Sequence, residues 1–184
     1  MWHKHGVTRR DRPPPPPPPP LDAVALDRLA LRYVERFATT RGKLADYLYR
    51  KVRERGWAGD RPADPAAVAD RMAALGYVDD RGYAVMKGAA LGRRGYGARR
   101  VADVLRVAGV TPDDAGPALH DAREEAWGRA LELARRKRIG AFAAEPADAR
   151  LRARQLAQML RAGHDLSIAR RLIDAAPGEV PEIE

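Results

Sequence analysis

The sequence Leu44-Ala45-Asp46-Tyr47-Leu48 returns as Val101-Ala102-Asp103-Val104-Leu105 and as Leu156-Ala157-Gln158-Met159-Leu160, at separations of 57 and 55 residues. Each copy leads through basic residues to a glycine: Gly56, Gly109 or Gly163. A glycine at this point suits the left-handed backbone that commonly ends a helix. A period of this length predicts tandem helical repeats.

A new helix start follows each of these glycines. Asp64-Pro65 and Thr111-Pro112 place a capping side chain before a proline at the first helical position, and Asp165 is the candidate cap in the third copy. The helix that opens each copy is expected at residues 23–38, 81–93 and 122–138. In the first of these, apolar residues recur at helical spacing: Leu26, Leu29, Ala30, Tyr33, Val34 and Phe37.

The predicted fold is therefore all-α: three tandem three-helix repeats that bury their faces against one another in an elongated, curved, solenoid-like body. Alternating patterns typical of strands are missing from the sequence. We expect repeats at 21–79, 80–121 and 122–176. A flexible acidic C-terminal tail is expected at 177–184, and a disordered basic tail with a polyproline linker at 1–20.

The unbroken run from Pro13 to Pro20 lacks amide donors and favours an extended polyproline II rod. A spacer is the favoured interpretation, and a ligand for an aromatic groove is the alternative. His3 and His5 near the amino terminus are read as incidental rather than as metal ligands.

The chain has 34 Lys and Arg residues against 25 Asp and Glu, giving a formal net charge of +9. The excess lies within residues 21–175, which favours a polyanionic partner such as nucleic acid, although a generally Arg-rich proteome would give the same balance. The 184 residues contain no cysteine, so disulfides and thiolate chemistry are excluded. No membrane span or secretory signal is recognisable, and we expect a cytoplasmic monomer.

Catalysis is not supported by the residues. His120 and His164 lack partners at metal-ligand spacing, and Ser167, the sole serine, lacks the glycines of a nucleophile elbow. No P-loop or dinucleotide-binding glycine pattern is present. We therefore expect a protein without enzymatic activity, metal or cofactor.

Two stretches together are similar to the RecX family. They are Leu75-Gly76-Tyr77-Val78-Asp79-Asp80-Arg81-Gly82-Tyr83-Ala84 and Arg93-Arg94-Gly95-Tyr96-Gly97-Ala98-Arg99-Arg100-Val101. They reproduce that family's apolar-aspartate-tyrosine-alanine junction, its glycine-tyrosine-glycine turn and its basic helix start. The resemblance covers roughly residues 22–175. The longer turn at residues 57–63 and the glycines at 88 and 92 depart from it.

The resemblance implies a regulator that binds the RecA recombinase filament on single-stranded DNA. Such proteins limit filament growth and damp strand exchange, ATP hydrolysis and co-protease activity in recombination and the SOS response. Two alternatives remain: a general helical nucleic-acid-binding protein with no recombinase partner, and a helical adaptor for another acidic protein.

The candidate contact residues are basic. Five residues crowd one turn, where arginine can fork onto carboxylate or phosphate: Arg93, Arg94, Tyr96, Arg99 and Arg100. The alternative there is an inter-helix turn with a solvated charged face on which Tyr96 packs. Further candidates for partner or phosphate contact are Arg106, Arg135, Arg136, Lys137, Arg138 and Arg152. Cations that end a helix also complement its dipole, so part of the 135–138 run has a structural explanation.

Overall fold

The computed structural model describes residues 18–182, and the regular secondary structure of that part of the chain is helical apart from one isolated bridge between Leu21 and Trp57. The predicted all-α class is confirmed. The α-helices are α1 (Ala23–Val34), α2 (Arg41–Arg55), α3 (Pro65–Ala74), α4 (Asp80–Gly92), α5 (Ala98–Val107), α6 (Pro112–Glu124), α7 (Ala126–Lys137), α8 (Ala149–Arg161) and α9 (Leu166–Asp174). A short 3-10 helix, η2 (Gly140–Phe142), precedes α8.

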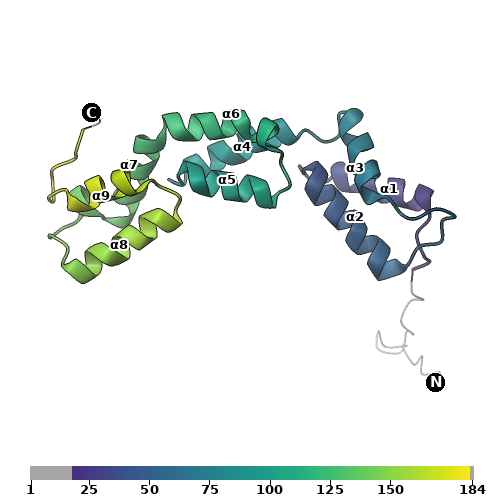
Figure 1. Ribbon diagram of the computed structural model, residues 1–184, viewed down its shortest axis with the longest axis horizontal. Helices are drawn as coiled ribbons and strands as arrows, with labels where there is room; N and C mark the ends of the chain where they lie inside the picture. Colours follow the sequence, from purple (N-terminus) through teal and green to yellow (C-terminus); the bar gives the residue numbers. More distant parts are fainter. Residues whose placement is uncertain (1–17, 183–184) are drawn as a thin grey trace, which may run out of the picture.

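The helices form three successive groups, each with its own apolar core. The first core is built by α1–α3 around Leu26, Leu44 and Leu48, and the second by α4–α6 around Val101 and Leu105. The third core lies among α7–α9 and includes Leu133, Met159 and Leu172. Figure 1 shows the groups in a row that forms a shallow arch, with α8, α5 and α2 along its inner side.

Most of the predicted helix ends are confirmed. The Asp64 and Thr111 side chains accept hydrogen bonds from the amides of Ala67 and Asp114 at the starts of α3 and α6. The three repeat glycines have positive φ values of 82°, 72° and 89°, a backbone region that favours glycine. Asp165 occupies the cap position of α9, but its side chain makes no capping hydrogen bond.

Two predicted opening helices differ from those in the structure. The first ends at Val34 rather than at residue 38, so Phe37 lies beyond it with 54% of its surface exposed. The helix predicted at 122–138 is interrupted at Glu125, with α6 continuing to Glu124 and α7 beginning at Ala126. The expected boundary between residues 121 and 122 therefore falls inside α6, where Ala122 belongs to the second core.

The third copy of the sequence pattern is misaligned by one residue. In α5 the buried positions are Val101 and Leu105, whereas in α8 they are Gln155 and Met159. The backbone after each helix shows the same offset. The His164 amide donates to the Met159 carbonyl, and the Val110 amide donates to the Leu105 carbonyl in the same way. Leu160, which the pattern aligns with the buried Leu105, is 38% exposed. Gln155 is thus the structural counterpart of Val101.

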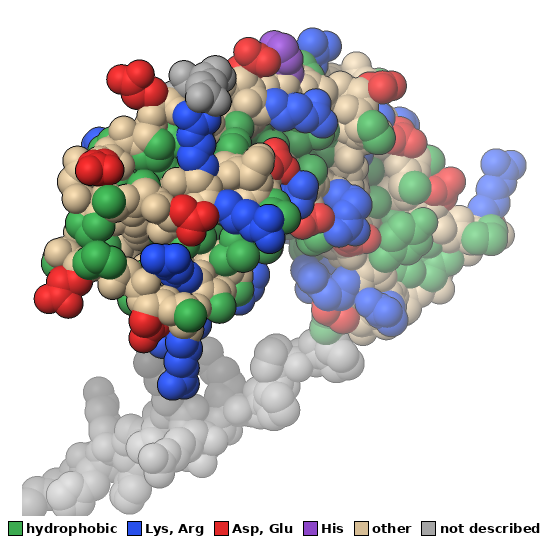
Figure 2. All heavy atoms as spheres, turned by 60° about the vertical axis from the view of Figure 1, so that its left-hand side comes forward, with side chains coloured by type: hydrophobic (Ala, Val, Ile, Leu, Met, Phe, Trp, Pro, Cys, Tyr) green, Lys and Arg blue, Asp and Glu red, His purple; other side chains and the backbone are tan. Residues whose placement is uncertain are grey.

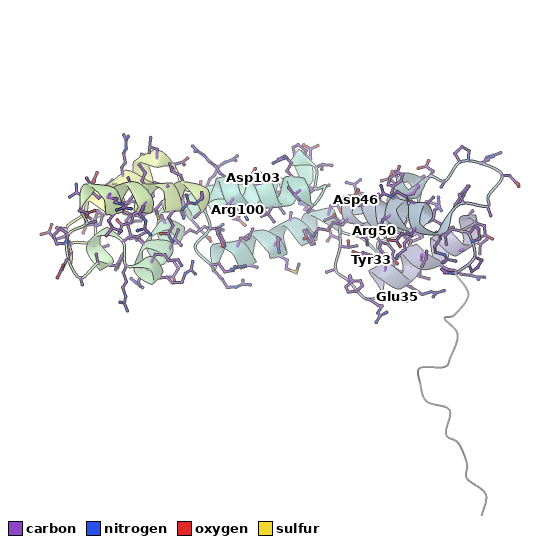
Figure 3. All side chains as sticks on the ribbon, turned by 90° about the horizontal axis from the view of Figure 1, so that it is seen from below. Tyr33, Glu35, Asp46, Arg50, Arg100 and Asp103 are labelled. Atoms are coloured by element: carbon purple, nitrogen blue, oxygen red, sulfur yellow. The ribbon has the colours of Figure 1, made fainter. Side chains whose placement is uncertain are left out.

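The second helices of the groups, α2, α5 and α8, follow one another head to tail. The start of α5 docks on the end of α8, where the Gly97 amide donates to the Ala162 carbonyl at 2.9 Å. The start of α2 docks on the end of α5, where the Thr40 hydroxyl donates to the Ala108 carbonyl. Seen from below in Figure 3, Arg100 of α5 and Arg50 of α2 lie on helices placed one after the other along the body. At both of these joints between groups, the N-terminal end of one helix therefore faces the C-terminal end of another, an arrangement that the helix dipoles favour.

The predicted N-terminal tail lies mostly outside the described residues, as do His3 and His5. At its described end, Arg55 donates two hydrogen bonds to the Pro19 carbonyl, and Leu21 is fully buried in the first core. In the segment expected as an acidic tail, the Gly178 amide donates to the Ala141 carbonyl at 2.9 Å. None of the helices within residues 18–182 has the length and apolarity that a membrane crossing needs.

Candidate interaction groove

A groove of about 800 Å³ lies where the second and third groups of helices meet. We call it the basic groove. The turn between α4 and α5 forms one side, and α7 and α8 form the others. Its lining residues are Arg94, Tyr96, Arg100, Leu133, Arg136, Lys137, Gln158, Arg161 and Ala162. Five of the sequence-predicted residues therefore come together here: Arg94, Tyr96, Arg100, Arg136 and Lys137.

The turn that carries Arg94 and Tyr96 is held against the third group by backbone contacts. Gly95 has φ of 68°, and a Cβ atom on it would lie 2.9 Å from the Leu133 amide nitrogen, so glycine is required on both counts. Arg136 donates a hydrogen bond to the Arg94 carbonyl. The Arg94 guanidinium carbon lies 5.3 Å from the Tyr96 ring centre, within cation–π range.

Tyr96 packs against both the second and the third core. This supports the packing role that the sequence left open for it. One edge of the ring still lines the basic groove. Tyr96 therefore joins two cores while it carries Arg94 on its face.

His164 supports the same turn from beneath. It is 2% exposed, and its Nε2 atom lies 2.9 Å from the Gly95 carbonyl oxygen, to which it donates. Burial lowers the pKa of His164 below its ordinary value of 6.5, although the Gly95 hydrogen bond opposes this. A neutral imidazole that donates from Nε2 fits both observations.

The charge of the groove lining is entirely positive. Arg94, Arg100, Arg136, Lys137 and Arg161 line it, and no carboxylate from residues 18–182 does. Cations that converge on a concave surface without acidic partners raise the local potential and attract polyanions. Gln158 and Tyr96 add neutral hydrogen-bonding groups.

Two smaller hollows extend this surface along the inner side of the arch. One shares Gln158 and Arg161 with the basic groove and adds Arg154. The other shares Arg100 and reaches Lys87 of α4 and Lys43 of α2, with Asp103 as the acidic member. The positive lining thus passes along α8 and α5 towards the start of α2.

Other sequence-predicted residues lie away from the groove and have different partners. Arg99 forms an ion pair with Asp165 at 2.7 Å, and Arg106 forms one with Asp103 at 3.3 Å. All four side chains are more than half exposed, so neither pair contributes much to stability. Arg93 lines a separate hollow beside the buried Arg129.

The remaining three candidates have local contacts in the third group. Arg135 lies over the Phe142 ring at 5.4 Å, and Arg152 donates to the Ala147 carbonyl. Arg138 ends α7 with φ of 54°, the one non-glycine residue in the described chain with left-handed backbone. The 135–138 run is therefore divided, with Arg136 and Lys137 on the groove and the outer two residues elsewhere.

Gln158 and Arg161 were not among the predicted site residues. Both belong to α8. The sequence signal for them was the third copy of the repeat, but its one-residue misalignment hid which side of α8 faces the turn. Exposed charge gives little guidance, because Lys and Arg are interspersed with acidic side chains over the surface in Figure 2. No group of three or more acidic or histidine side chains within residues 18–182 could hold a metal ion.

Comparison with known proteins places the chain in a family. It is 33% identical over 162 residues to the regulatory protein RecX of Myxococcus xanthus, an alignment that covers 83% of this chain and 86% of its relative. The chain belongs to the RecX family. A crystal structure of a regulatory protein RecX is similar in fold, with a TM-score of 0.56 at 19% identity over 82% of this chain and 73% of that one. A scan against protein-family models finds no match. The relatives in this family are named as regulatory proteins. The basic groove is observed in this chain itself.

Proposed function

We propose that this RecX-family chain is a non-enzymatic regulator that binds the RecA filament on single-stranded DNA and inhibits its activities. The observation that carries the proposal is the basic groove, in which five cations converge and no carboxylate of the described residues takes part. A filament of protein on single-stranded DNA presents phosphates, and arginine forks match phosphate and carboxylate oxygens. RecA as the partner comes from the resemblance to the RecX family.

The shape of the body supports the same proposal. Three groups of helices form an elongated arch whose inner side carries the groove and its two extensions. An elongated curved surface suits a partner that is itself extended. Contact along neighbouring filament subunits would oppose extension of the filament and favour its disassembly.

The test is RecA ATP hydrolysis on single-stranded DNA, titrated with this protein at fixed salt. We expect inhibition well below one molecule per RecA. Arg100→Glu combined with Arg161→Glu should weaken that inhibition at least tenfold, because it reverses two groove charges. Arg28→Glu with Arg123→Glu makes the same change in net charge at two exposed residues on α1 and α6, and should inhibit like the parent.

Two results would contradict the proposal. Equal inhibition by a folded groove variant and by the control would remove the groove from the interaction. Binding to bare DNA without any effect on RecA would favour a general nucleic-acid-binding protein instead.

A further inference from the structure

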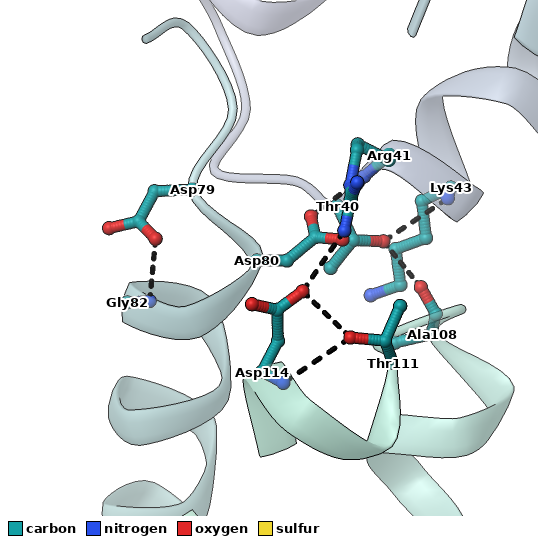
Figure 4. A network of polar contacts seen from close by, with 9 residues as sticks. All are labelled: Thr40, Arg41, Lys43, Asp79, Asp80, Gly82, Ala108, Thr111 and Asp114. Atoms are coloured by element: carbon teal, nitrogen blue, oxygen red, sulfur yellow. Dashed lines mark hydrogen bonds and ion pairs between the residues drawn. The ribbon is translucent and has the colours of Figure 1, made fainter. Parts of the chain in front are cut away.

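A network of polar contacts joins the first and second groups of helices. Arg41 at the start of α2 donates from its amide and from Nε to the Asp80 carboxylate, at 2.9 and 3.0 Å. Its Nη2 atom donates to Asp114 at 3.0 Å. Thr40 and Lys43 donate to the Ala108 carbonyl and the Tyr83 hydroxyl across the same joint. Figure 4 shows most of this network.

The apolar cores on the two sides of this joint are separate. Among residues 18–182, the core of the first group and the core of the second have no residue in common. Two backbones also lie close together here, since a Cβ atom on Gly42 would lie 2.8 Å from the Cα of Gly109.

The joint between the second and third groups is different. Tyr96 packs into both cores there, and the buried His164 donates to the Gly95 carbonyl. Only Glu125 separates α6 from α7, so the chain passes between these groups without a loop. This joint has an apolar interior, whereas the first has a polar one.

Arg41 is the central residue of the first joint because it binds two carboxylates from two different helices. The Asp80 side chain is only 3% exposed, whereas that of Arg41 is 37% exposed. Hydrogen bonding to Asp80 raises the pKa of Arg41. A half-exposed arginine that holds a buried carboxylate is open to competition from ions and water at its outer face.

We infer that the first joint is a hinge held by the Arg41 latch (Arg41, Asp80 and Asp114), on which α1–α3 turn as a unit relative to a rigid body of α4–α9. Releasing the latch changes the curvature of the arch. It leaves each core intact, because the core residues lie outside the latch. The inference does not depend on the proposed function.

The absence of cysteine from the sequence makes the hinge measurable with fluorescent labels at introduced cysteines. A hinge pair, Asp60→Cys with Met86→Cys, spans the first joint at exposed positions. A control pair, Met86→Cys with Glu145→Cys, spans the second joint. Single-molecule energy transfer then reports the separation within each pair. We expect Arg41→Gln to shift and broaden the distribution for the hinge pair at low salt and to leave the control pair unchanged.

A high salt concentration should shift and broaden the distribution for the hinge pair in the parent protein, as Arg41→Gln does. Raising the salt concentration from about 0.05 M to about 1 M reduces the Debye length to ~3 Å and weakens the latch. Because Arg41→Gln leaves Asp80 buried without its partner, it can unfold the protein. The double variant Arg41→Gln with Asp80→Asn removes both charges and answers the same question, with circular dichroism to confirm helicity.

The inference is overturned if the folded double variant gives the parent's distribution for the hinge pair. It is also overturned if both pairs broaden together, because the change would then be a general loosening rather than a hinge.

Discussion

Gly97 at the start of α5 lies so close to Gly163 that a Cβ atom added to Gly97 would be 2.3 Å from the Gly163 carbonyl oxygen. Gly97 has φ of −77°, so the backbone would accept any residue, and the restriction is purely one of space. The close approach lets the Gly97 amide reach the Ala162 carbonyl. The joint that builds the basic groove therefore depends on the absence of one side chain.

Gly97→Ala should lower the free energy of unfolding by about 1–3 kcal/mol, because the backbone of the second joint must move apart. Gly116→Ala, on an exposed face of α6 with no atom within 4 Å of the new Cβ, is the matched control. It should raise stability by about 0.5–1 kcal/mol through helix propensity. Urea unfolding of both variants measures the difference, and equal effects would show that the joint tolerates the methyl group.

Gln155→Leu should stabilise the protein by about 1 kcal/mol. Gln155 is 7% exposed, and its Oε1 atom has no hydrogen-bond partner in the structure. Leucine would fill the position as Val101 does in α5, without a buried acceptor to desolvate. Gln158→Leu, three residues along α8 and half-buried, should change stability less. Thermal unfolding measures the stability of both variants. A loss of stability in Gln155→Leu would mean that the Gln155 amide makes hydrogen bonds that stabilise the fold.

Stability should fall as the solution becomes acidic because of His164. Burial lowers its pKa in the folded state, so the unfolded chain takes up a proton first as the pH drops. The neutral ring makes its full contribution to stability at pH values above the ordinary histidine pKa of 6.5. This contribution is lost as the pH falls towards the lowered pKa of His164 in the folded state. We expect a clear fall in melting temperature between about pH 7.5 and about pH 5.

His164→Val, which copies Val110 of the second group, should flatten this pH dependence while losing the bond to Gly95. His120→Gln, at an exposed position of α6, should keep the parent's slope. An unchanged slope in His164→Val would assign the acid sensitivity to other groups.

The salt dependence of DNA binding should identify groove residues individually. Each phosphate contact contributes about 0.9 to the slope of log affinity against log salt for duplex DNA. Arg161→Ala should therefore reduce that slope by about 1, and Arg123→Ala, exposed on α6, should leave it unchanged. Fluorescence anisotropy with a labelled oligonucleotide at several salt concentrations gives the slopes, and equal slopes would argue against phosphate contact by Arg161.

The fold was predictable because helix periodicity and end signals act locally. Gly109 and Thr111 mark the end of one helix and the start of the next whatever surrounds them. The interruption at Glu125 was not visible, because the residues on both sides favour helix. The register of α8 was misleading for a related reason. Leu156 and Leu160 resemble core residues in sequence, but the buried positions of α8 are Gln155 and Met159, and Leu156 is only partly buried against the third core.

The site was predictable only in part, since a basic residue gives no sign of what faces it. Arg99 and Arg100 are neighbours in sequence, yet Arg99 pairs with Asp165 and Arg100 lines the basic groove. Helix geometry turns successive side chains by about 100°, so adjacent arginines face different partners. Arg161 comes to the same groove from more than sixty residues away, through the docking of α5 on α8.

The head-to-tail series of α8, α5 and α2 is closed by hydrogen bonds at the two ends that lie within residues 18–182. At the end of α2, the Gly56 carbonyl accepts a hydrogen bond from the Leu21 amide. At the other end, the Asp148 side chain caps α8 by accepting from the Leu151 amide. Both ends are thus occupied by hydrogen bonds within the chain. Across residues 18–182, the span of any surface that the arch covers is therefore set by three helices placed end to end rather than by the strength of its contacts.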